Sequence, residues 1–187
     1  MSYLRAFAPW IVFSLIPSGD WQWAALIALV ISAAGIVLQR RAGLPLDAQI
    51  IELGSAVYFG ALTILAFAAP HTALHAYTSS MANGALAVIA LGSLLVRKPF
   101  TLGIAKQTTP RELWNHPRFL RTNTVITSVW AASFVVSCVL LTLLAHSSAN
   151  GRTIVQVAAF AAPLVFTLRY VARVQALAAE HGVQIQV

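Results

Sequence analysis

Six apolar stretches divide this chain, and their lengths constrain the fold more than any other feature of the sequence. They run over residues 3–16, 21–38, 50–69, 80–96, 124–145 and 153–171. A helix needs roughly 20 apolar residues, with a range of about 17 to 25, to cross the hydrocarbon core of a bilayer. The last five stretches meet that length. The first is too short to do so comfortably and contains Pro9, so it predicts a short spanning helix or a re-entrant segment.

Composition indicates that lipid is the solvent for these helices. Hydrophobic residues make up 59% of the 187 residues, charged residues make up 9%, and the mean hydropathy is +0.78. A soluble domain carries roughly 25% charged residues. We therefore predict an all-α polytopic membrane helix bundle, a single integral membrane domain over residues 1–187, with five full transmembrane helices plus the short N-terminal segment. That segment has no small-x-small cleavage site, so we expect the mature protein to retain it.

The basic residues are divided unequally between the two ends of the predicted helices. If the first stretch crosses, all 12 Lys and Arg residues except Arg152 fall on one side. Cytoplasmic loops of bilayer proteins are enriched in Lys and Arg. We therefore expect a multi-pass protein of the bacterial cytoplasmic (inner) membrane with its C-terminus in the cytoplasm. The same rule accounts for the net charge of +7 without a nucleic-acid partner.

One predicted cytoplasmic loop, at about residues 97–123, carries half of the positive charge. Thr109 and Pro110 have the pattern of an N-cap and a first helical position, and Pro117 would end the helix, so a short amphipathic helix on the inner leaflet is predicted. A solvated connector anchored by a tryptophan is the alternative. We expect this loop to bind anionic lipid headgroups or a protein partner. Its candidate binding residues are Arg97, Lys98, Lys106, Arg111, Trp114, Arg118 and Arg121.

Three polar residues within the apolar stretches form a candidate intramembrane site, because polar groups at membrane depth are costly. They are Glu52, Asn83 and Asn123. Glu52 is expected either to pair with a basic residue at the membrane boundary or to face the bundle as a proton or cation site. The candidate partners for that pairing are Arg40, Arg41 and Arg97. Asn83 and Asn123 begin predicted spans, where capping or hydrogen bonding between helices is favoured over ligand binding.

No enzyme motif is found in the sequence. It lacks a glycine-rich phosphate loop, a G-x-S-x-G nucleophile elbow and an H-E-x-x-H pair. His71 and His75 have the i, i+4 spacing that places two imidazoles on one helical face, but no third metal ligand is evident. We predict no catalytic residue, no cofactor and no metal site.

Two parts of the chain share an order of features. Residues 23–65 and 83–141 each contain an Ala-rich helix, a basic pair, a proline, a loop and a helix of opposite direction. This order suggests a weak parallel repeat of two helices.

Several motifs taken in order resemble a known family. They are FAPWIVFSLIP near the N-terminus, an Ala-rich second helix that ends in basic residues, RKPF at the end of the fourth, Trp114 in the loop, and the run from Asn123 through Trp130 to Phe134. This order resembles the intracellular septation protein A family, also called the inner membrane-spanning YciB family. The resemblance implies a bacterial inner-membrane protein tied to cell-envelope synthesis and division through contacts with other membrane proteins, and it implies no catalytic residue.

Two functions follow as predictions. The first is a non-enzymatic inner-membrane protein that supports cell-envelope synthesis or division through lipid and protein contacts. The alternative is a small transporter or lipid translocator with Glu52 as its intramembrane site. A homodimer is expected for the alternative, because six short helices leave little room for a pathway within one chain.

Overall fold

The computed structural model describes residues 5–147 and 149–180, and the regular structure in these ranges is entirely helical. Its α-helices are α2 (Ala8–Leu15), α3 (Trp21–Arg41), α4 (Ile50–Ala68), α5 (Thr78–Leu95), α6 (Phe100–Lys106), α7 (Pro117–Leu143) and α8 (Ala149–Glu180). Four short 3-10 helices connect them: η1 (Ser18–Asp20), η2 (Leu46–Ala48), η3 (Ala73–Tyr77) and η4 (Arg111–Leu113). Five of the described helical segments are long and apolar enough to cross a membrane. The predicted all-α membrane helix bundle is confirmed.

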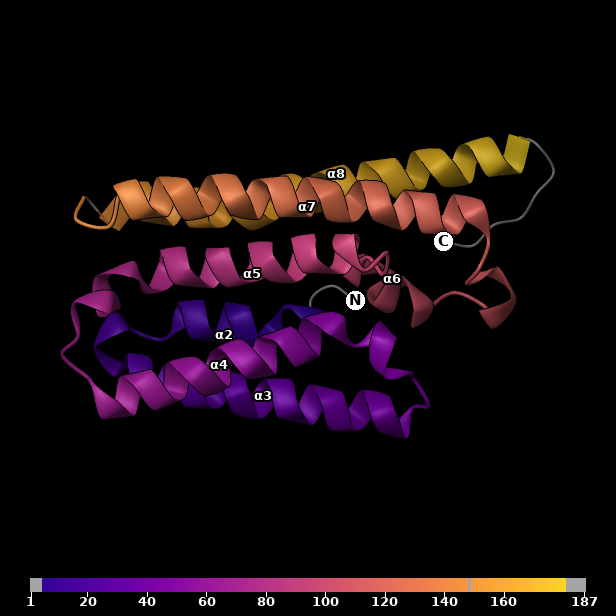
Figure 1. Ribbon diagram of the computed structural model, residues 1–187. Coiled ribbons are helices and arrows are strands. Elements are labelled where there is room, and N and C mark those ends of the chain that lie inside the picture. The colour runs from indigo at the N-terminus through magenta and orange to yellow at the C-terminus, as the bar shows by residue number, and fades with distance from the viewer. Residues whose placement is uncertain (1–4, 148, 181–187) are drawn as a thin grey trace.

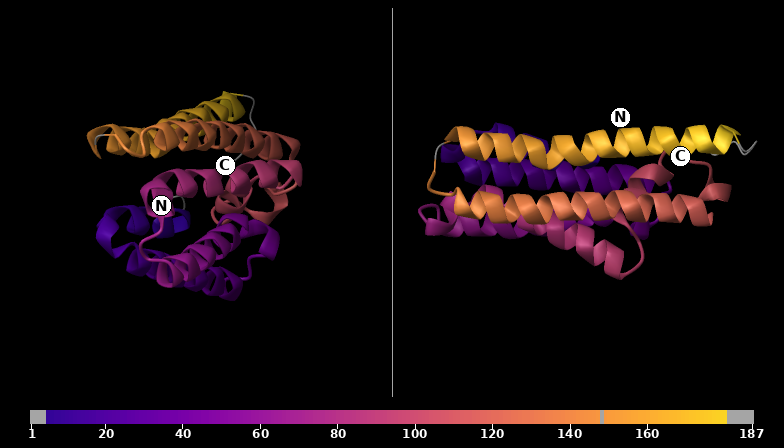
Figure 2. Two further views of the ribbon diagram at one scale, coloured as in Figure 1. Left: turned by 60° about the vertical axis from the view of Figure 1, so that its left-hand side comes forward. Right: turned by 90° about the horizontal axis from the view of Figure 1, so that it is seen from above.

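The long helices form two antiparallel pairs, α3 with α4 and α5 with α7 (Figure 1). Helix α8 lies along α7, as Figure 2 shows. The Trp130 indole of α7 donates to Thr167 Oγ1 of α8 at 3.1 Å, and Ser133 Oγ donates to the Ala159 carbonyl at 3.0 Å. We call the end of the bundle where α3 and α5 finish and α4 and α7 begin the basic end. The other is the opposite end.

Helix α2 lies between the two pairs in Figure 1, where it packs on α3, and the residue before it reaches the second pair. Phe7, directly before α2, stacks on Trp130 with ring centroids 4.8 Å apart. Three residues later, the Trp10 indole donates to Ser55 Oγ of α4 at 2.8 Å. A helix of eight residues rises only roughly 12 Å, against a hydrocarbon core of roughly 30 Å. The described part of the first apolar stretch therefore reaches only part of the way across, and its helix leaves the basic half of α3 uncovered.

Both helix pairs turn at the basic end with the same type of C-cap. After α3, Gly43 has φ +75, and the Leu44 N–H donates to the Gln39 carbonyl at 3.1 Å. After α5, Arg97 has φ 56, and the Lys98 N–H donates to the Ser93 carbonyl at 2.8 Å. Each is a Schellman motif, which needs a left-handed residue just past the helix. The shared direction and turn agree with the weak parallel repeat expected from the sequence.

The amphipathic helix predicted from Thr109 to Pro117 is wrong. The helix in this loop is α6, which begins at Phe100, and the predicted segment contains only the three-residue η4. Six residues between two prolines are too few to stabilise an α-helix. Pro117 begins α7 instead of ending a helix, because a proline at the first helical position loses no hydrogen bond.

The two asparagines do not cap helices, because α5 and α7 begin earlier than the apolar stretches that predicted them. Asn83 Nδ2 donates to the Ser79 carbonyl at 2.9 Å, and Asn123 Nδ2 donates to the Phe119 carbonyl at 2.9 Å. Both bonds stay within one helix. Asn123 also contributes its backbone to the packing of α6 on α7, since its carbonyl accepts from Thr101 Oγ1 at 3.0 Å.

Candidate functional site

The space left by the short α2 forms a cavity of about 610 Å³, which we call the basic-end cavity. Its walls come from the start of the α2 segment, the second half of α3, the first turn of α4 and the segment from α6 to Trp114. The apolar part of the wall is made by Ala6, Ala8, Pro9, Ile31, Ala34, Gly35, Leu38, Ala42, Leu44 and Pro110. The polar part is made by Arg5, Ser32, Gln39, Glu52, Lys106, Gln107, Thr109, Arg111 and Trp114. The cavity is therefore amphipathic.

Glu52 lies in the first turn of α4 and faces α3. Its side chain is 5% exposed, and Gln39 Nε2 of α3 donates to its Oε1. Gly35 and Gln39 are four residues apart and so share one face of α3. A Cβ on Gly35 would lie 3.8 Å from Glu52 Cγ, an ordinary van der Waals distance, so Gly35 faces the Glu52 side chain. The Glu52 carboxyl group thus receives its hydrogen bond from a neutral amide and not from one of the three arginines expected from the sequence.

Three buried oxygens of the cavity lining have no hydrogen-bond partner among the described residues. They are Gln39 Oε1, Glu52 Oε2 and Thr109 Oγ1. All three side chains are more than nine-tenths buried, with exposed fractions of 7%, 5% and 6%. A buried polar atom that stays unpaired costs about 1–3 kcal/mol, so most buried polar groups in proteins are paired. Each of these oxygens requires a donor such as water or a ligand.

Two cations of the basic loop are held at the same cavity by one tryptophan. Lys106 Nζ lies 5.0 Å from the Trp114 ring centroid, and Arg111 Cζ lies 5.6 Å from it. The Trp114 indole donates to the Thr109 carbonyl at 3.0 Å, which closes the turn around η4. A Cβ on Gly43 would lie 3.8 Å from Arg111 Nη2, so this side chain reaches back to the end of α3. The loop therefore folds over the cavity.

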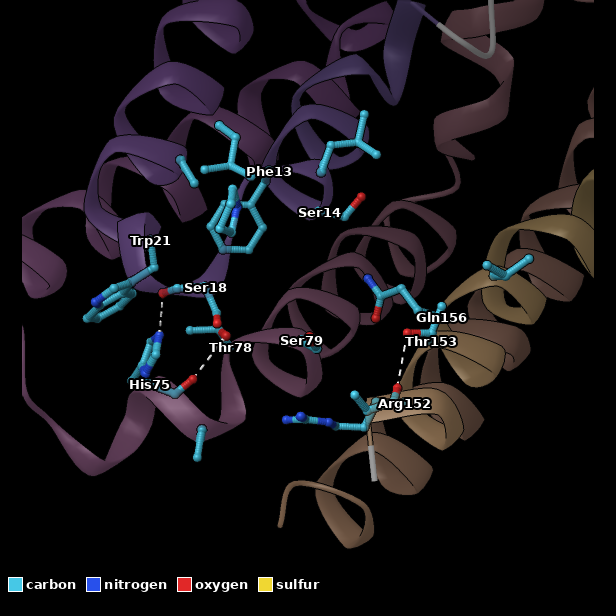
Figure 3. Close-up of a pocket in the computed structure, with 17 residues that line it drawn as sticks. Phe13, Ser14, Ser18, Trp21, His75, Thr78, Ser79, Arg152, Thr153 and Gln156 are labelled. Carbon is cyan, nitrogen blue, oxygen red and sulfur yellow. Dashed lines mark hydrogen bonds between the residues drawn. The ribbon is translucent and has the colours of Figure 1, made fainter. Parts of the chain in front are cut away.

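A second cavity of about 670 Å³ lies at the opposite end of the bundle (Figure 3). Phe13 to Ser18, at the C-terminal side of α2, line it together with residues of α5, η3 and α8. His75 makes a hydrogen bond of 2.7 Å from Nε2 to the Ser18 carbonyl and fixes η3 against η1. The Arg152 guanidinium points from α8 into the space between α8 and η3, as Figure 3 shows. We call this the opposite-end cavity.

The structure brings together only some of the residues predicted as a site. Glu52, Lys106, Arg111 and Trp114 all line the basic-end cavity. The other predicted site residues line neither of the two cavities: Asn83, Arg97, Lys98, Arg118, Asn123 and Arg121. His75 lies in η3 and His71 precedes it, so the two histidines do not share the face of an α-helix.

Sequence reasoning missed Arg5, Gln39 and Thr109 as parts of the site. Gln39 could have been found by its helical spacing from Gly35, because a small residue and an amide on one face of an apolar helix mark a polar contact between helices. No pattern in the sequence pointed to Arg5, whose place depends on how α2 packs between the helix pairs.

Five described helical segments of membrane length and the large exposed hydrophobic side chains along them define the chain as a multi-pass α-helical membrane protein. No family model, curated protein or solved structure with which the chain was compared matches it.

Proposed function

We propose that this chain is a non-enzymatic protein of the bacterial cytoplasmic membrane that binds a phospholipid by its headgroup in the basic-end cavity. The observation that carries the proposal is the convergence of Glu52 with Lys106, Arg111 and Trp114 on one amphipathic cavity. Cations bind phosphate oxygens, and the apolar wall suits the first part of an acyl chain. A protein that binds phospholipid in this cavity could support cell-envelope synthesis through that lipid, as the sequence led us to expect.

The proposed location follows from the charge at the two ends of the bundle. Helices α3 and α5 finish at the end that carries Arg40, Arg41, Arg97 and Lys98, whereas Arg152 lies near the start of α8 at the other end. Basic residues of short loops remain on the cytoplasmic side. We accordingly propose that the basic end lies in the cytoplasm together with the C-terminus and that the cavity faces the inner leaflet.

The resemblance to the intracellular septation protein A family extends this proposal to partners. It supports a role in envelope synthesis or division in which the lipid-bound protein contacts other membrane proteins. The outer face of α8 suits such contacts, because Ile154, Val165 and Leu168 are exposed along it and line neither cavity. A second copy of the chain could use the same face, so the homodimer stays part of the proposal.

Arg111→Gln is expected to weaken phospholipid binding about tenfold. A charge-assisted hydrogen bond contributes roughly 1.5–3 kcal/mol, and about 1.4 kcal/mol corresponds to a factor of ten. The measurement is native mass spectrometry of the purified protein titrated with a defined phospholipid. Arg118→Gln is the matched control, because Arg118 carries the same charge, is exposed on α7 and does not line the cavity. Equal losses in the two variants would assign the effect to the charge of the loop and remove the cavity as the site.

Movement of the bound lipid between leaflets is a second candidate function. The observation that favours it is the opposite-end cavity, which α2 separates from the basic-end cavity and which also contains a cation, Arg152. The two cavities have similar volumes and offer a polar surface on each side of α2.

For this second function, Arg152→Gln is expected to slow the transfer of a fluorescent phospholipid between leaflets severalfold in protein-containing vesicles. The reason is that the opposite-end cavity would lose its cation for the phosphate. Transfer is measured by chemical quenching of the label in the outer leaflet. Arg173→Gln serves as the control on the same helix, since Arg173 is exposed and lines neither cavity. If wild-type vesicles transferred lipid no faster than protein-free vesicles, translocation would be abandoned and binding alone retained.

A further inference from the structure

The basic-end cavity presents groups of two kinds to a ligand. Arg5, Lys106 and Arg111 bring positive charge to it, whereas Glu52 brings a carboxyl group. An anion alone would suit the positive charge but would leave Glu52 Oε2 without a donor. A simple cation would suit the carboxyl group but would be repelled by the positive charge of the lining. The lining therefore fits a ligand that carries both signs of charge.

The unpaired atoms define the cationic part of that ligand. Gln39 Oε1, Glu52 Oε2 and Thr109 Oγ1 are oxygens that can accept hydrogen bonds, and none has a donor among the described residues. A primary ammonium group offers three N–H donors and one positive charge. A trimethylammonium group has the charge but no N–H donor, and a glycerol headgroup has donors but no charge. The primary ammonium alone matches both features.

The cations define the anionic part. Arg111 presents a planar guanidinium with several N–H donors, which suits the oxygens of a phosphodiester. Trp114 holds this guanidinium and the Lys106 ammonium by contacts of both with its ring. The two cations are thus positioned on one side of the cavity by the protein itself and need little ordering when a phosphate binds.

The apolar wall identifies the source of the ligand as lipid. Ile31, Ala34 and Leu38 lie along α3 beside the polar groups, and Leu38 is 63% exposed at the rim. An exposed leucine on a membrane-length helix meets hydrocarbon chains. A soluble phosphate ester would leave this part of the wall without a partner.

The geometry points to an aminophospholipid as the ligand: its ammonium group binds at Glu52, Gln39 and Thr109, and its phosphate binds at Arg111 and Lys106. This inference rests on the proposed function and adds to it the chemical class of the headgroup. A trimethylammonium headgroup is disfavoured because it leaves the buried acceptors without donors, and a glycerol headgroup is disfavoured because it brings no positive charge to Glu52.

The test is a competition, followed by native mass spectrometry, between phospholipids with identical acyl chains. Wild-type protein is expected to prefer phosphatidylethanolamine over phosphatidylglycerol, and also over phosphatidylcholine, by about tenfold. Glu52→Gln keeps the size of the side chain and its bond with Gln39 but removes the charge, and it is expected to abolish the preference. Thr109→Val is expected to reduce it. If Glu52→Gln fails to fold, the wild-type lipid series and Thr109→Val decide the question.

Three results would overturn the inference: no preference in the wild type, a preference retained in a folded Glu52→Gln variant, or full competition by soluble glycerophosphoethanolamine at the concentrations of the lipid. Arg111→Gln separates the failure of this inference from failure of the proposed function. If Arg111→Gln weakens every phospholipid equally while the wild type shows no preference, the headgroup class is wrong and the lipid site remains. If neither Arg111→Gln nor Glu52→Gln changes the binding of any lipid, both the headgroup class and the lipid site are wrong.

Discussion

Phe7→Ala is expected to lower the free energy of unfolding by about 2–4 kcal/mol and to release α2 from the second helix pair. The Phe7 ring is 3% exposed and stacks on Trp130 at 4.8 Å. It also meets Phe160 of α8 at 5.4 Å and Phe100 of α6 at 6.1 Å, so one side chain joins α2 to three other helices. In lipid the loss comes mainly from packing contacts, because the surrounding chains are as apolar as the protein interior.

Equilibrium unfolding in mixed micelles measures this effect. Phe67→Ala is the control, since it removes the same side chain from α4 at a position that is 50% exposed on the outside of the bundle. We expect that variant to lose only about 1 kcal/mol, because Phe67 is half exposed and the ring it meets, that of Trp23 at 5.4 Å, is half exposed as well. Similar losses in the two variants would mean that the ring cluster adds no specific stability and that α2 is held mainly by Trp10.

Gly103→Ala is expected to destabilise the protein by about 1–3 kcal/mol and to reduce lipid binding as well. Gly103 lies in α6, where a Cβ would overlap the carbonyl oxygen of Ala48 in η2. The obstacle is backbone, so it cannot be relieved by a rotamer change. Helix α6 must move away from η2, and Lys106 at its end would move with it and leave the basic-end cavity.

Gly92→Ala provides the matched control within α5. A Cβ at that position meets nothing within 4 Å, and alanine is favoured over glycine in a helix by about 1 kcal/mol. We therefore expect Gly92→Ala to bind lipid as the wild type does and to be at least as stable. Thermal unfolding and the lipid titration are measured on both variants. A Gly103→Ala protein with wild-type stability would show that α6 is not fixed by its contact with η2.

The long helices could be predicted because the bilayer imposes their length on the sequence. Hydropathy failed at the start of α7, which begins at Pro117 whereas the apolar stretch begins at Thr124. The intervening Thr122 and Asn123 are polar yet buried, and they are accommodated by the packing of α6 against α7. Hydropathy counts side chains one at a time, so it does not recognise a polar turn that neighbouring helices cover.

The candidate site was predicted only in pieces. Glu52 was found because a carboxyl group near an apolar run is costly, and Arg111 and Trp114 were found because the loop is rich in charge. Their convergence depends on the turn around η4 and on the length of α2, which are tertiary features. Two sites that the sequence presented as alternatives, the carboxyl group and the basic loop, line one cavity in the structure.

The position of α2 between the helix pairs also affects the order of assembly during synthesis. Phe7 leaves the ribosome long before Trp130 and Phe160, whose rings it contacts in the folded protein. At roughly 5–20 residues per second, the wait for Phe160 lasts about 8–30 s. During that time the α3 and α4 hairpin can already insert, while α2 has only half of its binding surface. Helix α2 is therefore translated before the helices on which it packs, and it is among the last to reach its final place.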